Sequence, residues 1–187
     1  MEQEFQIRLL RLQKKGLLHQ SISIVQLISI ANNIGTHLSQ ENDQQTLALR
    51  SGSIKCLQHI HCSSDASAHS ELANANYSGV LVIAISTACG HVEEYDKEIR
   101  NRLFRISQFL KYLIKGNQYS FPPQPLLARR SDEQIEEEGG NEEIDSQLIN
   151  KGKGSFWSIK NNANGAKRAI LNYFIKQSNQ RPICYNW

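Results

Sequence analysis

Apolar residues recur at helical spacing through most of the chain, and the clearest case is the stretch 93–115. Acidic residues fill its first turns and lysines its last, as the helix dipole favours, and Gly116 follows as a stop. The stretch therefore predicts an amphipathic helix whose apolar side the rest of the chain must cover. The stripe consists of Ile99, Leu103, Ile106, Leu110 and Leu113, widened by Phe104, Phe109 and Ile114.

Weaker patterns predict further helices on both sides of this stretch. In 17–38 a local alternation also suggests a strand, but the length favours a helix. Gly52 predicts a kink or break, and the small residues of 62–70 predict either a loop or the frayed start of the next helix. The centre of 71–88, residues 80–85, also fits a buried strand by composition, so helix and strand both stay open there, with the helix favoured. The predicted helices are 2–15, 17–38, 44–61, 71–88 and 157–177.

These elements predict an all-α fold, either a multi-helix bundle or a short helical stack that resembles armadillo or HEAT proteins in architecture, without their signature residues. Three prolines between 117 and 127 predict an extended linker. Short acidic helices would follow it, the first capped by Ser131 and the second by Asn141. We divide the chain into a helical core (1–116), a Pro-containing acidic linker (117–154) and a basic helix with its tail (155–187), packed on the core.

Charge is segregated along the chain more than its net value of +3 indicates. Of the 21 Lys/Arg and 18 Asp/Glu residues, 1–92 holds six of each, and 93–150 holds eight basic and twelve acidic residues. The remaining 37 residues, 151–187, hold seven basic residues and no acidic one. This asymmetry predicts a basic surface that meets an anionic partner or the chain's own acidic segment.

The sequence predicts a cytoplasmic or nuclear protein that does not insert into a membrane. Its longest apolar run, 80–88, is too short to cross a bilayer. The N-terminal stretch begins with acidic residues and is amphipathic, unlike a secretory signal.

One cluster has the residue types of a metal site, namely Cys56, His59 and Cys62. Thiolates and imidazoles suit zinc, and Cys56 and His59 share a helical face. His61 points away from that face, however, and no second pair follows at a zinc-finger interval, so we predict buried cysteines and no metal or cofactor. No nucleophile with its base and no phosphate-binding loop is recognisable, so we predict no enzyme.

The function predicted is a non-catalytic adaptor or scaffold subunit of a larger complex, because amphipathic helices and short loops suit protein–protein contacts. Its partner would be a protein, with an acidic one as a specific option. The alternative is nucleic-acid binding through the basic C-terminal segment, where Phe156, Trp157 and Tyr173 accompany the lysines. The candidate interaction residues are Arg100, Arg102, Arg105, Lys111, Lys160, Lys167 and Arg168.

The acidic segment 132–145 carries eight carboxylates and no basic residue. It predicts either a disordered solubilising loop or a shield that folds back over Arg100, Arg105 or the C-terminal lysines. Ser131 follows two arginines and precedes two acids, which makes it a candidate phosphorylation site.

Overall fold

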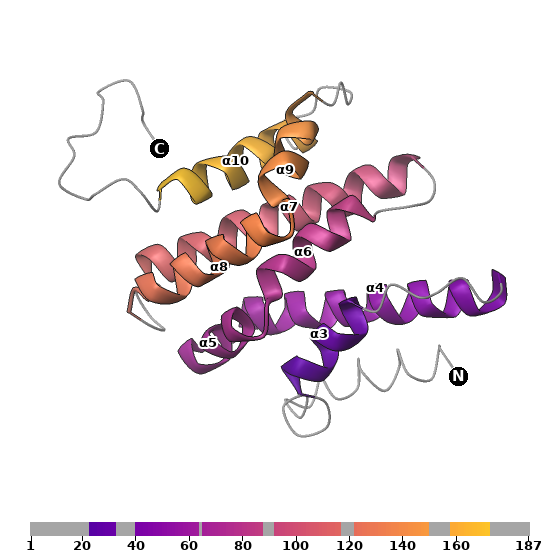
Figure 1. Ribbon diagram of the computed structural model, residues 1–187, viewed down its shortest axis with the longest axis horizontal. Coiled ribbons are helices and arrows are strands. Elements are labelled where there is room, and N and C mark those ends of the chain that lie inside the picture. The colour runs from indigo at the N-terminus through magenta and orange to yellow at the C-terminus, as the bar shows by residue number, and fades with distance from the viewer. Residues whose placement is uncertain are drawn as a thin grey trace.

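The computed structural model describes residues 23–32, 40–63, 65–87, 92–116, 122–149 and 158–172 (Figure 1). Within these residues all regular structure is helical, which confirms the all-α prediction and makes residues 80–85 a helix. The predicted helix 2–15 lies outside the described residues. The helices are α3 (Ile24–Asn32), α4 (Gln40–Ser63), α5 (Ala66–Asn74), α6 (Tyr77–Ser86), α7 (Val92–Lys115), α8 (Pro125–Glu137), α9 (Gly140–Ile149) and α10 (Ile159–Asn172).

The short helix α6 lies at the centre of the molecule. It contacts α3, α4 and α5 on one side and α7, α8 and α9 on the other (Figure 1). Nearly all of its residues are buried, because the segment is apolar around its whole circumference. Residues 80–85 therefore lie in a buried helix, which was the favoured of the two alternatives.

Helix α7 begins at Val92, one residue before the predicted start, and ends at Lys115 as predicted. Its predicted stripe is buried except at Ile99, which is partly buried. Leu103, Ile106, Leu110 and Leu113 are buried, and Phe109 is fully buried beside them. Two neighbours cover this side, since α6 packs against α7 and α10 lies along it.

The predicted helix 71–88 is wrong at its N-terminal end, because the chain turns at Ala75 and Asn76 between α5 and α6. Asn76 has left-handed backbone angles (φ 71°, ψ 39°), and its side chain accepts a hydrogen bond from the Gly79 amide at 3.2 Å. Such an N-cap ends one helix and begins the next. Of the two alternatives for 62–70, the structure has the start of a helix, because the Asp65 side chain caps α5 by accepting from the Ala68 amide.

Helix α4 continues through Gly52, so the predicted break is wrong. A glycine inside a helix costs only about 1 kcal/mol relative to alanine. The burial of Ile54 and Leu57 on the same helix offsets that cost.

Helix α8 begins inside the region predicted as an extended linker. Pro125 occupies its first turn, where a missing amide proton costs nothing, and the Gln124 amide donates to the Leu113 carbonyl of α7 at 2.7 Å. Ser131 therefore lies in the middle of a helix and does not cap one. Ile135 and Ile144 join the same hydrophobic core as α6 and α7. The domain boundaries at 116 and 154 stay predictions.

Replacing two helical glycines by alanine should change the stability of the protein in opposite directions. A Cβ on Gly140 would lie 2.5 Å from Ile135 Cγ2 and 2.7 Å from the Ile135 carbonyl oxygen, whereas one on Gly165 would meet Ser107 Oγ at 3.6 Å. We expect Gly140→Ala to lower the free energy of unfolding by about 1–3 kcal/mol through overpacking. Gly165→Ala should raise it by about 0.5–1 kcal/mol, because alanine favours the helix. Urea unfolding of both variants measures this, and equal effects would contradict the close approach at Gly140.

Candidate functional site

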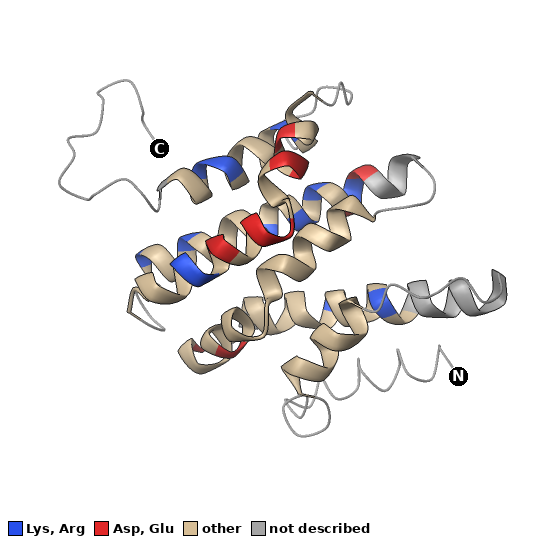
Figure 2. Ribbon diagram, viewed as in Figure 1, with Lys and Arg blue, Asp and Glu red and all other residues tan. Residues whose placement is uncertain are grey.

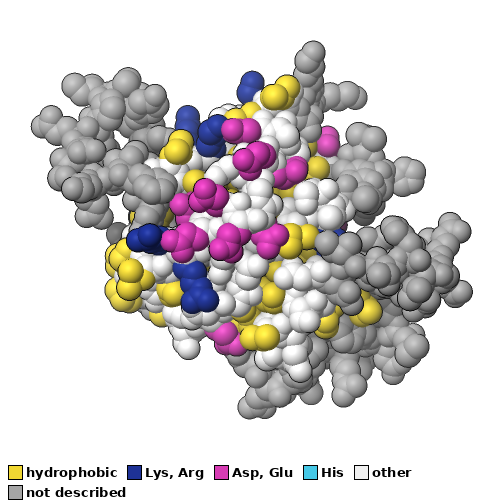
Figure 3. Space-filling view, in the orientation of Figure 1, with side chains coloured by type: hydrophobic (Ala, Val, Ile, Leu, Met, Phe, Trp, Pro, Cys, Tyr) yellow, Lys and Arg dark blue, Asp and Glu magenta, His cyan; other side chains and the backbone are white. Residues whose placement is uncertain are grey.

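The acidic segment forms a largely exposed face on helices α8 and α9 and the turn between them, which we call the acidic face. Figure 3 shows Asp and Glu side chains gathered over these two helices on one side of the molecule. The face consists of Asp132, Glu133, Glu136, Glu137, Glu138, Glu142, Glu143 and Asp145.

The pattern of buried residues in α8 directs these carboxylates outward. Ala128, Ser131, Gln134 and Ile135 are buried, so the positions between them face water. The Gln134 side chain fixes this side of α8 by donating to the Ala73 carbonyl of α5 at 2.7 Å. The acidic residues are therefore held on packed helices, and they do not form the free loop that was one expectation.

Like charges are crowded on this face. Burial raises the pKa of the Asp132 carboxyl above its ordinary value, and the neighbouring Glu136 and Glu133 raise it further. Within the described residues, the ion pairs of the face lie at its two margins, from Arg129 to Glu133 (2.9 Å) and from Lys167 to Asp145 (2.5 Å). The second pair joins the acidic segment to a C-terminal lysine. This single contact agrees with the hypothesis that the acidic segment folds over the C-terminal lysines.

Arg102, a candidate interaction residue, is placed inside the protein. Its side chain is only 7% exposed, and its guanidinium donates to the Ala84 carbonyl of α6 (2.8 Å) and to Glu98 Oε2 (2.6 Å). Burial lowers its pKa, and the adjacent Glu98 opposes that effect. Arg102 therefore makes its contacts within the chain. The sequence could not show this, because no pattern distinguishes an arginine that binds a helix end from one that faces water.

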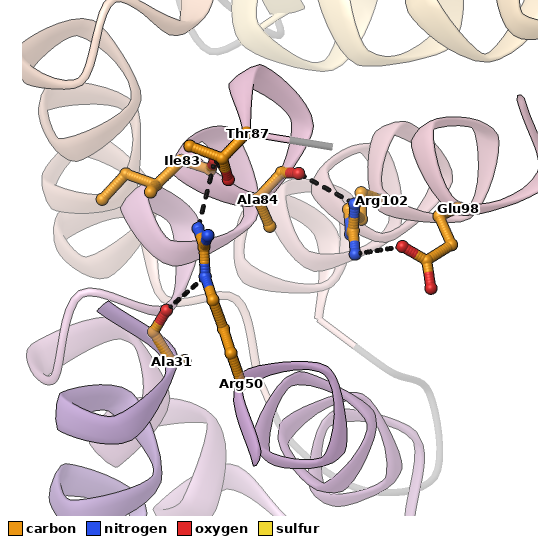
Figure 4. A network of polar contacts seen from close by, with 7 residues as sticks. All are labelled: Ala31, Arg50, Ile83, Ala84, Thr87, Glu98 and Arg102. Carbon is orange, nitrogen blue, oxygen red and sulfur yellow. Dashed lines mark hydrogen bonds and ion pairs between the residues drawn. The ribbon is translucent and has the colours of Figure 1, made fainter. Parts of the chain in front are cut away.

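A second buried arginine acts in the same way at the same helix end (Figure 4). Arg50 of α4 donates from Nε to the Ala31 carbonyl at 2.8 Å and from Nη2 to the Ile83 carbonyl at 3.4 Å. Arg50 thus satisfies the Ala31 carbonyl in the last turn of α3, and Arg102 satisfies the Ala84 carbonyl in the last turn of α6, where helices leave acceptors unpaired and attract cations. The Ile83 carbonyl also accepts from the Thr87 amide. These two arginines stabilise the fold, and we assign them no partner.

The other predicted residues on α7 are distributed over different environments. Arg105 donates to Cys62 Sγ at 2.7 Å and faces α4, whereas Arg100 is half-buried. Lys111 lies near Lys115 and near Arg168 of α10. Burial lowers the pKa of Lys111, and the charges of Lys115 and Arg168 lower it further. The structure thus brings together two of the predicted residues, Lys111 and Arg168, and adds Lys115.

These cations collect where two helices end and a third begins. Gly165 of α10 faces Ser107 of α7, and the charge of Arg168, three residues later, lowers the pKa of Lys111, four residues later. Helices α10 and α7 therefore run in the same direction and end near one another. Helix α8 begins there, and Figure 2 shows basic residues at this end of α7 and α8. We call this region the basic end and define it by Lys111, Lys115, Arg129, Arg130 and Arg168. Two predicted lysines are not part of it, because Lys160 lies in the first turn of α10 and Lys167 binds Asp145.

The weak metal candidates do not form a site. Cys56 is buried, which raises the pKa of its thiol, whereas His59 and Cys62 are exposed. Across the described ranges, no group of three or more His, Cys, Asp or Glu residues is placed to hold a metal ion.

A buried histidine cluster escaped the sequence analysis. His61 is 1% exposed and meets the rings of His69, Tyr77, Phe109 and Tyr112 edge to face, with centroids 5.3–5.8 Å apart. Neither of its ring nitrogens has a hydrogen-bond partner in the described structure, so its polar edges face aromatic rings. Burial lowers the pKa of His61 to about 3, with smaller contributions from the charges of His69 and Arg105.

Ser131, the candidate phosphorylation site, is fully buried on the inner side of α8. A kinase would reach its hydroxyl only after α8 had separated from the core. Phosphorylation at Ser131 stays a prediction, and it would require that opening.

Comparison with known proteins gives no relative, since no family model, curated protein or solved structure matches the chain. In the part of the chain that the structure describes, no helix combines the length and apolar character needed to span a bilayer.

Proposed function

We propose that this chain is a non-catalytic adaptor or scaffold subunit whose acidic face holds a lysine- or arginine-rich segment of a partner protein. The observation that carries the proposal is that the carboxylates of 132–145 lie outward on two helices packed into the core. A face fixed in this way loses little conformational freedom on binding, which favours recognition.

The electrostatics of the face favour a basic partner. Burial is the main cause of the raised pKa of Asp132, and the like charges of Glu136 and Glu133 add to it. A cationic partner would relieve this added repulsion. The earlier expectation of an acidic partner has less support, because Arg102 is inside the protein and Lys167 is bound to Asp145.

We favour a helical bundle over an armadillo- or HEAT-like stack, since α6 contacts helices distant in sequence, whereas repeats in a stack contact only their neighbours. We also propose a cytoplasmic or nuclear location, on the sequence arguments given above.

Capture of partners from nuclease-treated native extract tests the proposal. The bait is the full chain, compared with a variant that carries Glu136→Gln, Glu137→Gln and Glu138→Gln. Exposed charge pairs contribute about 0–1 kcal/mol each, so the variant should recover roughly tenfold less of any partner of the face. Raising the salt concentration should have a similar effect.

The control is Glu71→Gln, which neutralises an exposed carboxylate on α5, outside the segment 132–145. It should recover partners as the unmodified chain does. If the same proteins bind all three baits equally, the acidic face is not the contact surface. If nothing survives nuclease treatment, the adaptor proposal itself is contradicted.

A further inference from the structure

We propose that the basic end, together with the exposed apolar residues beside it, docks on the surface of an anionic lipid bilayer. This inference does not depend on the acidic face or on a protein partner. It rests on an apolar tip, on the cations around it and on the scarcity of carboxylates in the same segments.

The apolar tip lies at the start of α8. Leu126 is 81% exposed, the highest value among the large exposed hydrophobic residues of the described structure. Pro122, Pro123 and Pro125 next to it are also exposed, whereas Leu127 packs against the core. Figure 3 shows hydrophobic side chains beside Lys and Arg at this end of the molecule. Leu126 therefore projects into water without a described packing partner.

Cations lie on the same side and around the tip. Arg129 and Arg130 follow Leu126 by three and four residues, so all three share one side of α8. The hydrogen bond from the Gln124 amide to the Leu113 carbonyl holds the start of α8 against the last turns of α7, where Lys111 and Lys115 lie. Leu171, half-exposed on α10, follows Arg168 by one turn and extends the apolar character of this end.

Carboxylates are scarce in the segments that build this end. The chain has no Asp or Glu from 99 to 131 or from 146 to 187, which includes the last turns of α7 and all of α10. The nearest acids along α8 are Asp132 and Glu133, and Glu133 is bound to Arg129. On α5, Glu71 lies one turn before Asn74, which accepts a hydrogen bond from Arg130. The basic end is thus electropositive next to the acidic face.

A lipid surface fits this combination better than a nucleic acid does. Nucleic-acid phosphates would neutralise the cations, but they would leave the aliphatic tip in water. An anionic bilayer accepts both features, because lysine and arginine bind its headgroups while a leucine enters the boundary of the acyl chains. The helices lie on the membrane in this arrangement and do not cross it.

Co-sedimentation of the full chain with vesicles tests the proposal. One set of vesicles is pure phosphatidylcholine, and the other contains about one third phosphatidylserine. We expect binding to the anionic vesicles only, weakened by salt. The double variant Lys111→Gln with Lys115→Gln should bind at least tenfold more weakly, since each cation contributes about fivefold. Leu126→Glu should also lower binding at least tenfold.

Matched controls lie elsewhere on the surface. Ile149→Glu changes a residue on α9 that is 78% exposed, and Lys160→Gln removes an exposed cation in the first turn of α10. Both should bind as the unmodified chain does, and circular dichroism and thermal unfolding confirm that every variant folds. The proposal is overturned by equal binding to both vesicle types, by no binding, or by equal losses in the controls. It is also overturned if the chain does not bind the anionic vesicles but binds single-stranded RNA or polyglutamate, and the double variant at Lys111 and Lys115 weakens that binding.

Discussion

Replacement of Phe109 by alanine should lower the free energy of unfolding by about 3–5 kcal/mol, the usual cost of removing a buried aromatic ring. Phe109 is fully buried on α7, and its ring meets those of Tyr77 (5.1 Å) and His61 (5.3 Å) edge to face. The cavity would open between α4, α6 and α7, where surrounding rings cannot collapse without losing their own contacts. Urea unfolding monitored by circular dichroism measures the change.

Phe104→Ala is the matched control, because it removes the same side chain from the same helix. Phe104 is only partly buried, and its described ring contact is with the Arg105 guanidinium, 5.7 Å from the ring centroid. We expect a loss of about 1–2 kcal/mol, since a half-exposed ring removes less apolar surface from water. Equal losses in the two variants would show that the core does not centre on Phe109.

Acid should destabilise the protein through His61. In the fold its pKa is lowered to about 3, whereas an unfolded histidine has a value of about 6.5. Between these values the unfolded chain binds a proton that the folded chain excludes, so stability falls as the pH falls from about 6.5 toward 3. Lowering the pH from 7 to 5 should cost about 2 kcal/mol at this site.

The variant His61→Phe separates this effect from other acid-sensitive groups. Phenylalanine keeps an aromatic ring among the neighbours of His61 but does not titrate, so the slope of unfolding free energy against pH should become shallower between pH 7 and 5. His59→Gln, which changes an exposed histidine on the same helix, is the matched control. An unchanged slope in His61→Phe would mean that His61 is not held neutral by burial.

Sequence periodicity predicts the parts of the fold in which one helix buries one continuous stripe. Helix α7 is the clearest case, because Leu103, Ile106, Leu110 and Leu113 all reach the core. Helix ends are set by single hydrogen bonds and are harder to predict. Asp65 and Asn76 are residue types that commonly cap helices, and their presence was the available signal for the two ends that the sequence analysis missed.

Charge counts show which segment is acidic, but they do not show how its side chains are arranged. The sequence shows that 132–145 is acidic, but only the burial of Ser131, Gln134 and Ile135 shows that the segment is a helical face. Arg102 carries the same charge as Lys111, yet its position on α7 directs it toward the carbonyl of Ala84. The His61 cluster joins residues of α4, α5, α6 and α7, so no local pattern could reveal it.

Hydrogen exchange of the backbone amides in α8 and α9 tests the central claim most directly, because the acidic face depends on those helices being packed. The account predicts that amides near Ile135 and Ile144 exchange about as slowly as those of α7 near Ile106, since all three residues belong to one core. Exchange of residues 128–148 at the rate of an unstructured chain, with α7 still protected, would contradict it. The acidic residues would then form a loose linker, and the adaptor proposal would lose its surface.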